Sequence, residues 1–272
     1  MIPAIRVEWR KLVTTRIWWV LGIVLFGYVA FTSALFGGLF GAISTGAIGP
    51  EAAGGEAIPT EGLPPLVYST VTAVGYVIPL ILGTLSVTGE VRHGTLTPTF
   101  LAIPSRARVL VAKVVIMLVA GAGLGVVGLV ASMGVGGVVL AGFGIDPQLG
   151  DPETWAMAGR AVLAMALWAA IGVGIGSLIQ NQIAAVVVVI AFTQFVEPIL
   201  RTASAFWEPA AQVGRFLPGA ASDALVGSSV YAMFTGASAD ALLWWQGGLV
   251  LAALAVVVGV VGWATAWRRD IT

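Results

Sequence analysis

The chain contains no cysteine, a single histidine (His93) and few charged residues, which make up 10% of its 272 positions. Without cysteine, disulfides, thiolate nucleophiles and zinc–sulfur sites are excluded. One histidine rules out a multi-histidine metal site within the chain. The 13 basic and 13 acidic residues give a formal net charge of zero, so no overall basic surface points to nucleic acid as a partner. Soluble domains are about 25% charged, so this chain has too few charges to cover a water-exposed surface.

Apolar residues make up 58% of the chain and form long runs. A helix needs about 20 mainly apolar residues to cross a bilayer. The 36 glycines fit a membrane protein, because small residues let membrane helices approach closely. We therefore predict a single all-α membrane domain with six transmembrane helices, the third long enough to require a tilt or a kink. The predicted spans are about 17–42, 65–88, 109–141, 156–179, 183–200 and 242–266.

The basic residues are distributed unevenly among the segments that connect these spans. Ten of the 13 fall in the amino-terminal arm, in the connection between the second and third spans, or in the carboxy-terminal tail. They are Arg6, Arg10, Lys11, Arg16, Arg92, Arg106, Arg108, Lys113, Arg268 and Arg269. Because basic connections remain in the cytoplasm, this distribution predicts that both termini are cytoplasmic.

Three segments outside the spans have features of their own. Residues 1–16 are amphipathic and basic, which predicts an interfacial helix on the headgroups of membrane lipid. It is either a simple anchor or a contact for a cytoplasmic partner, and we do not expect a cleaved signal peptide. Residues 89–103 predict a short cytoplasmic helix, with Thr88 as its N-cap and Glu90 in its first turn. Residues 201–241 predict short external helices that enter the outer leaflet and return.

Motifs for catalysis and metal binding are absent from the sequence. There is no GxxxxGK[ST] loop, no HExxH pair and no GxSxG elbow, so no catalytic residue, metal site or bound cofactor is predicted in this chain. Ionisable groups within spans are functional candidates by default. Glu197 and Arg201 lie four residues apart, which fits either a structural ion pair or a role in transport. The candidate residues for a translocation path are Tyr76, Thr193, Gln194 and Glu197.

The connection between the second and third spans carries a resemblance to a known family. It reads Thr-Gly-Glu at the end of one span, then Arg-His-Gly-Thr-Leu, Pro-Ser-Arg and Ala-Lys at the start of the next. This pattern resembles the permease subunits of ABC type-2 exporters. The resemblance implies a non-catalytic permease in a bacterial cell membrane, paired with a second copy or a paralogue. ATP and Mg²⁺ would be bound by separate ABC ATPase subunits.

The resemblance also implies roles for particular segments. The helix at 89–103 would be the coupling helix that docks on the ATPase, and its motif residues are Glu90, Arg92, His93, Gly94 and Thr95. The amino-terminal arm would be the connecting helix, and the substrate would meet spans one, two and five. A mostly apolar lining would suit a hydrophobic or amphipathic substrate such as a drug, a lipid or a peptide antibiotic.

Three other classes of function remain open at this stage. A non-transporting membrane sensor or assembly factor would also have spans and a cytoplasmic docking segment. An intramembrane enzyme acting on lipid would need paired catalytic groups in the bilayer, and none is evident in the sequence. A secondary transporter would show inverted repeats and buried coupling groups, and no clear repeat is present.

Overall fold

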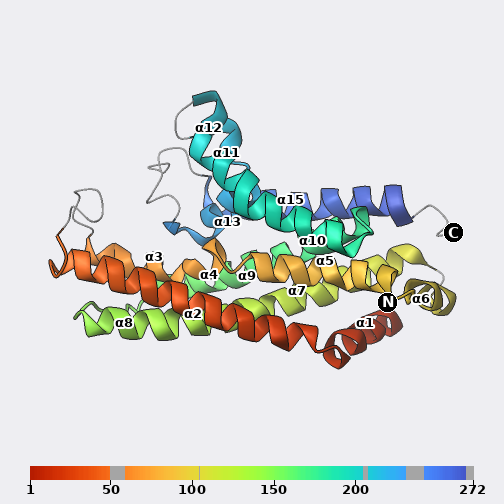
Figure 1. The fold of residues 1–272 in the computed structure, drawn as a ribbon, viewed down its shortest axis with the longest axis horizontal. Coiled ribbons are helices and arrows are strands. Elements are labelled where there is room, and N and C mark those ends of the chain that lie inside the picture. The colour runs from red at the N-terminus through yellow and green to blue at the C-terminus, as the bar shows by residue number, and fades with distance from the viewer. Residues whose placement is uncertain (50–58, 104, 205–207, 231–241, 268–272) are drawn as a thin grey trace.

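The computed structural model describes residues 1–49, 59–103, 105–204, 208–230 and 242–267. These residues form helices and their connections, with no strand among them (Figure 1). The elements are α1 (Ile2–Thr14), α2 (Ile17–Ser44), η2 (Thr60–Gly62), α3 (Leu63–Tyr68), α4 (Thr70–Ala73), α5 (Val77–Arg92), α6 (Leu96–Ala102), α7 (Arg106–Ala131), η3 (Ser132–Gly136), α8 (Gly137–Gly142), α9 (Pro152–Leu178), α10 (Gln182–Ala191), η4 (Phe192–Val196), α11 (Glu197–Ser204), α12 (Glu208–Gly214), α13 (Pro218–Val226), α15 (Trp244–Gly262) and η5 (Trp263–Trp267).

Within the part of the chain that the structure describes, five helices are long and apolar enough to cross a membrane, which identifies a multi-pass membrane protein. Their bounds agree within a few residues with five of the predicted spans. They are Ile17–Ser44, Arg106–Gly142, Pro152–Leu178, Gln182–Ser204 and Trp244–Thr265. In the most apolar window of Pro152–Leu178, 72% of the residues are buried, against 17% in Trp244–Thr265. Helix α9 therefore forms the protein core, whereas α15 presents most of its surface to the surroundings.

The second predicted span is not the continuous helix that hydropathy predicted. Residues 63–92 form three successive helices, α3, α4 and α5, which run along the length of the bundle (Figure 1). The second break falls before Pro79, which has no N–H to donate to the carbonyl of Gly75 and whose ring crowds that carbonyl. The Ile78 N–H bonds the Gly75 carbonyl instead, at 3.1 Å. Such irregular backbone is tolerated at membrane depth where protein surrounds it.

Hydroxyl side chains stabilise the first break between these helices. The hydroxyl of Ser69 donates to the Leu66 carbonyl at 2.7 Å, and that of Thr70 donates to the Val67 carbonyl at 2.7 Å. The Thr70 hydroxyl also lies 2.6 Å from the hydroxyl of Ser33 on α2. The polar residues of this segment are thus bonded locally, as expected for hydroxyls within a membrane protein.

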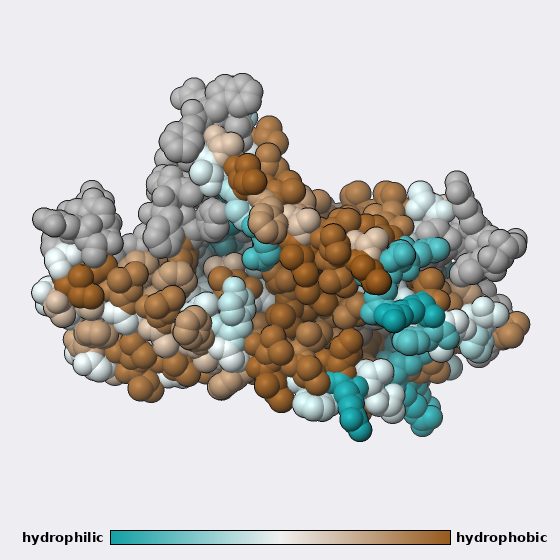
Figure 2. Space-filling model, viewed as in Figure 1, coloured by the Kyte–Doolittle hydropathy of each residue, from teal (hydrophilic) through white to brown (hydrophobic). Residues whose placement is uncertain are grey.

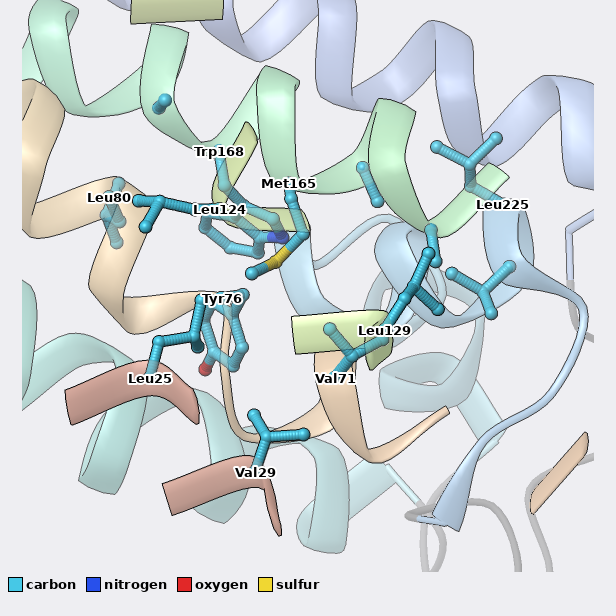
Figure 3. Close-up of a cluster of buried hydrophobic side chains, with 14 of the residues drawn as sticks. Leu25, Val29, Val71, Tyr76, Leu80, Leu124, Leu129, Met165, Trp168 and Leu225 are labelled. Carbon is cyan, nitrogen blue, oxygen red and sulfur yellow. The ribbon is translucent and has the colours of Figure 1, made fainter. Parts of the chain in front are cut away.

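Helix α9 packs closely against α5 and α7 through small residues. A methyl group on Gly83 of α5 would collide with the carbonyl of Ala169, and one on Gly172 would collide with the carbonyl of Leu80. This mutual approach is the packing that glycine permits between membrane helices. Figure 3 shows the resulting core, in which Trp168 and Met165 of α9 lie beside Tyr76 and Leu80.

The short helices at one end of the bundle differ from the predicted coupling helix. Helix α5 continues to Arg92, and the exposed helix α6 covers only Leu96–Ala102. Thr88 is therefore not an N-cap: it lies within α5, where its hydroxyl donates to the Thr84 carbonyl at 3.0 Å. Glu90 lies in the last turn of α5 rather than the first turn of a new helix. The chain turns at Gly94, whose φ of +65° suits glycine.

We refer to this part of the bundle, which carries α1, α6, the end of α5 and the start of α7, as the basic end. Hydrophilic residues gather there, next to a hydrophobic middle region (Figure 2). The start of α2 and the last turns of α15 lie at the same end (Figure 1).

The predicted external segment 201–241 includes α12 and α13 within its described residues, while 231–241 lie outside them. Helix α13 is well packed, with Ala221, Leu225 and Val226 buried. Its main neighbours are α15 and α9. Helix α13 is thus part of the bundle's core, and it packs against the membrane helix that contains α15.

Candidate functional site

A cavity of about 260 Å³ lies where the broken span meets the membrane helix Gln182–Ser204. All four residues predicted for a translocation path line it: Tyr76, Thr193, Gln194 and Glu197. Helix α2 contributes Tyr28 and Phe36 to the wall. The structure therefore brings together side chains that lie more than 100 positions apart in the sequence.

Two irregular segments of backbone form this cavity. One is the end of α4 with the break that follows it, which together contribute Thr72, Ala73 and Val74 to the lining. The other is the π turn η4, which contains Thr193 and Gln194. π turns within helices occur frequently at functional sites. The Tyr76 hydroxyl donates to the Thr193 carbonyl at 3.2 Å and so joins the two segments.

Tyr76 is held in place from the opposite side by Trp168. Their ring centroids are 4.5 Å apart, and the ring planes are inclined by 36°. Figure 3 shows the two rings next to each other in the buried cluster. The Trp168 indole N–H donates to the Ser222 hydroxyl of α13 at 3.2 Å. The cavity wall is thus continuous with the packed core of α9 and α13.

Glu197 is the most buried acidic residue at the cavity, with 2% of its surface exposed. Its Oε1 accepts a hydrogen bond from the backbone N–H of Gly219. A methyl group on Gly219 would contact the Glu197 carboxylate too closely, so the carboxylate would have to move. The other oxygen, Oε2, has no hydrogen-bond partner among the described residues. A buried polar atom without a partner is costly, so it calls for an explanation.

Arg201 forms an ion pair with Asp223 of α13, which also accepts a hydrogen bond from the Ser229 hydroxyl at 2.5 Å. From the sequence, only Glu197 was expected as a partner of Arg201. Asp223 and Gly219 were missed because the sequence assigned 201–241 to external helices. Pro218 marks the start of the short helix that carries both residues. The sequence does not indicate which span that helix contacts.

A second polar site lies at the basic end. The Nζ of Lys113 on α7 lies 2.5 Å from Glu8 Oε2 and 2.6 Å from Glu90 Oε1. Lys11 on α1 bonds Glu8 at 2.7 Å and Glu90 at 3.0 Å. We call these four residues the ion cluster. Its Lys113 and Glu8 side chains are only 1% and 4% exposed.

The ion cluster connects four helices. Glu8 and Lys11 come from α1, Glu90 from α5 and Lys113 from α7, and Lys11 also donates to the Thr99 hydroxyl of α6 at 3.2 Å. Burial alone lowers the pKa of Lys11, but the hydrogen bond to Glu8 and the charge of Glu90 outweigh it and raise this pKa above 10.5. Lys11 therefore carries a positive charge that holds the exposed helix α6 to the interfacial helix.

The predicted coupling residues occupy two different environments. Glu90 is part of the ion cluster, and its Oε2 is buried with no partner in the described chain. Arg92, His93, Gly94 and Thr95 are exposed or nearly so in the turn between α5 and α6. The Arg92 guanidinium donates to the Gln182 side chain at 3.2 Å, which links this turn to the start of α10.

Within the described ranges, no group of three or more His, Asp or Glu side chains is arranged to hold a metal ion. The two sites also differ in chemistry. The ion cluster has two bases and two acids that neutralise one another, whereas the cavity pairs one base with two acids. When the chain is compared with known proteins, no family model matches it and no curated protein matches it significantly.

Proposed function

We propose that this chain is the membrane-spanning permease subunit of an ATP-driven exporter similar to the ABC type-2 class. In this proposal residues 63–92 form a sixth crossing, both termini are cytoplasmic, and the basic end docks a separate ATPase. The chain would act as a dimer with a second copy or a paralogue. Its substrate would be hydrophobic or amphipathic and would move outward through the region of the cavity.

The observation that carries the proposal is the ion cluster. Helix α6 buries Leu96 and Thr99 but has an exposed face, with 81% of the Leu101 surface accessible, so a partner can reach it. Yet α6 is bonded through Thr99 and Lys11 to Glu90 on the broken span and, through Glu8, to Lys113 on α7. A displacement of α6 would therefore be transmitted through the ion cluster to two membrane helices, α5 and α7. A motor can drive a membrane protein only if its two states make different contacts with it.

The cavity supports the transport part of the proposal. The broken span ends at Arg92, near the proposed ATPase-docking site at the basic end. The same span also lines the cavity, with Thr72, Ala73, Val74 and Tyr76. Movement of α5 would therefore change the shape of the cavity. Discontinuous helices at membrane depth occur in transporters where substrate binds.

Affinity purification of the chain in mild detergent, followed by mass spectrometry and an ATPase assay, tests the proposal. We expect a nucleotide-binding subunit in stoichiometric amount and ATP hydrolysis by the complex. Leu101→Asp on α6 should remove the ATPase, whereas Leu149→Asp, at another exposed leucine at the other end of the bundle, should retain it. A chain that purifies without any ATPase from its native membrane contradicts the proposal.

The proposed orientation has its own test, because the chain contains no cysteine to interfere with labelling. Single cysteines are introduced as His93→Cys and Leu149→Cys. With a membrane-impermeant maleimide on intact cells, Leu149→Cys should react and His93→Cys should react only after permeabilisation. Labelling of His93→Cys in intact cells would show that α6 lies outside the cell. A cytoplasmic ATPase could not then dock on it.

A further inference from the structure

We propose that the cavity binds an amphipathic organic cation, a molecule with an ammonium group and a small aromatic or aliphatic body, and that the Glu197 carboxylate receives the ammonium. The binding site is argued from the cavity alone. The statement that such a cation is the exported substrate rests on the proposed function.

The acidic and basic residues at the cavity wall do not balance in number. Among the described residues, three that carry charge line it: Glu197, Arg201 and Asp223. Arg201 and Asp223 form an ion pair with each other, and the Ser229 hydroxyl adds a further bond to Asp223. The described part of the lining therefore carries one acid more than it carries bases. A cation would balance that charge, and an anion would be repelled by it.

The second argument is the state of the Glu197 carboxylate. The Gly219 N–H fixes its Oε1, while its Oε2 has no partner among the described residues. Removing a carboxylate from water is costly unless charged or hydrogen-bonding groups compensate for it. An ammonium group supplies both a positive charge and N–H donors. Glu197 lies at the cavity wall, so a ligand there can supply the partner that Oε2 lacks among the described residues.

The third argument is the character of the remaining wall. Phe36, Ala73, Val74, Pro198 and Val230 form apolar surface, and Tyr28 and Tyr76 add aromatic rings. Aromatic faces attract cations and also pack against apolar bodies. Binding sites for small molecules typically combine mainly apolar walls with a few polar groups that set orientation. At about 260 Å³, the cavity suits a body of about the size of two fused rings rather than a large macrocycle.

The experiment compares three probes of one shape on the purified full-length chain in lipid nanodiscs. The probes are 1-naphthylmethylamine, which is a cation at neutral pH, the neutral 1-naphthalenemethanol and the anionic 1-naphthoate. Binding is measured by equilibrium dialysis, with empty nanodiscs of the same lipid to subtract partition into the bilayer. We expect saturable binding of the amine at one site per chain, weaker binding of the alcohol and none of the anion.

The matched variants are Glu197→Gln, which keeps the shape and the acceptor for Gly219, and Glu61→Gln at an exposed position outside the cavity lining. Loss of a buried charge partner typically costs a complex at least 2 kcal/mol, so Glu197→Gln should weaken amine binding roughly 30-fold and leave alcohol binding unchanged. Glu61→Gln should bind all three probes as the unaltered chain does. Equal binding of the amine and the alcohol by the unaltered chain overturns the inference, and that comparison needs no variant. Unchanged amine binding by a folded Glu197→Gln chain also overturns it.

The outcome is separable from that of the proposed function. The dialysis assay needs no ATPase. If the chain purifies with an ATPase but does not bind the amine selectively, the cation inference fails and the exporter proposal stands. If it binds the amine selectively but has no ATPase partner, the cavity assignment stands and the exporter proposal fails.

Discussion

Lys113 on α7 and Glu8 on α1 form a buried ion pair, with Nζ and Oε2 2.5 Å apart, although the residues are separated by 105 positions in the sequence. The amphipathic helix α1 is therefore not held by lipid headgroups alone. One of its charged residues points into the protein and ties the helix to the start of a membrane span. Because Glu90 of α5 bonds the same lysine at 2.6 Å, three helices share one cation.

Lys113→Met tests the importance of that cation. The change leaves the carboxylates of Glu8 and Glu90 with Lys11 as their remaining basic partner among the described residues. Breaking a buried ion pair by removing one partner costs about 3–5 kcal/mol. We therefore expect a large decrease in the thermal unfolding midpoint in detergent and faster tryptic cleavage after Lys11. Arg108→Met, which removes an exposed base from the same helix, should change neither measurement.

The double variant Lys113→Met with Glu8→Gln separates charge from packing. Removing both partners relieves the unpaired carboxylate, so the double variant should be more stable than the sum of the two single changes predicts. If the losses simply add, the pair at 2.5 Å contributes no coupling and α1 is held by other contacts.

The pH dependence of Lys11 gives a second prediction. Its pKa in the folded protein lies above 10.5, because the bonds to Glu8 and Glu90 outweigh the effect of burial. A group whose pKa is raised on folding contributes stability that is fully present below the unfolded pKa and is lost as pH rises through the folded pKa. The stability difference between the unaltered chain and Lys11→Met should therefore be constant up to about pH 10 and shrink above it. Differential scanning fluorimetry in a detergent stable to alkali measures this, and a difference that grows at high pH would contradict it.

Five of the membrane helices were predictable because lipid solvates apolar side chains and their lengths are set by the bilayer. The break before Tyr76 was missed, although Gly75 and Pro79 are both visible in the sequence. Those residues permit a break without requiring it, since isolated prolines also occur within continuous helices. What favours the break here is the surrounding protein, in which α5 packs along α9 and the hydroxyls of Ser69 and Thr70 find local acceptors.

Part of the candidate site was predictable because polar side chains are conspicuous within apolar spans. Tyr76, Thr193, Gln194 and Glu197 were identified as polar groups within apolar spans, and all four line one cavity. Their partners were not predictable, because contacts such as that of Gly219 with Glu197 depend on how a short helix returns to the bundle. The ion cluster was missed because an amphipathic helix with basic residues is equally typical of a helix that contacts only lipid.

Close packing of α5 on α9 gives a third prediction. A methyl group on Gly83 or Gly172 would collide with the backbone of the opposite helix. Gly83→Ala and Gly172→Ala should each destabilise the protein by about 1–3 kcal/mol, because overpacking separates the helices. Gly159→Ala is the matched control, since nothing lies within 4 Å of the position its methyl would take. It should be neutral or should stabilise α9 by up to about 1 kcal/mol, as alanine favours helix over glycine. Equal thermal midpoints for all three variants would contradict the packing.

The fourth prediction concerns transmission from the ion cluster to the cavity. Glu90→Gln keeps the shape of the side chain but removes the charge that bonds Lys11 and Lys113. Under the proposed function, the variant should still assemble with its ATPase and hydrolyse ATP, while nucleotide should no longer rearrange the cavity.

The reporter is a single cysteine, Gln194→Cys, at an exposed position on the cavity wall. In the complex, ATP with vanadate should change its maleimide labelling rate, and Glu90→Gln should reduce that change at least about twofold, because the link between the two states is weakened. Glu61→Gln, at the opposite end of the bundle, should preserve the full change. If Glu90→Gln preserves it as well, the ion cluster is a structural anchor for α1, and the signal from the ATPase reaches the cavity by another route.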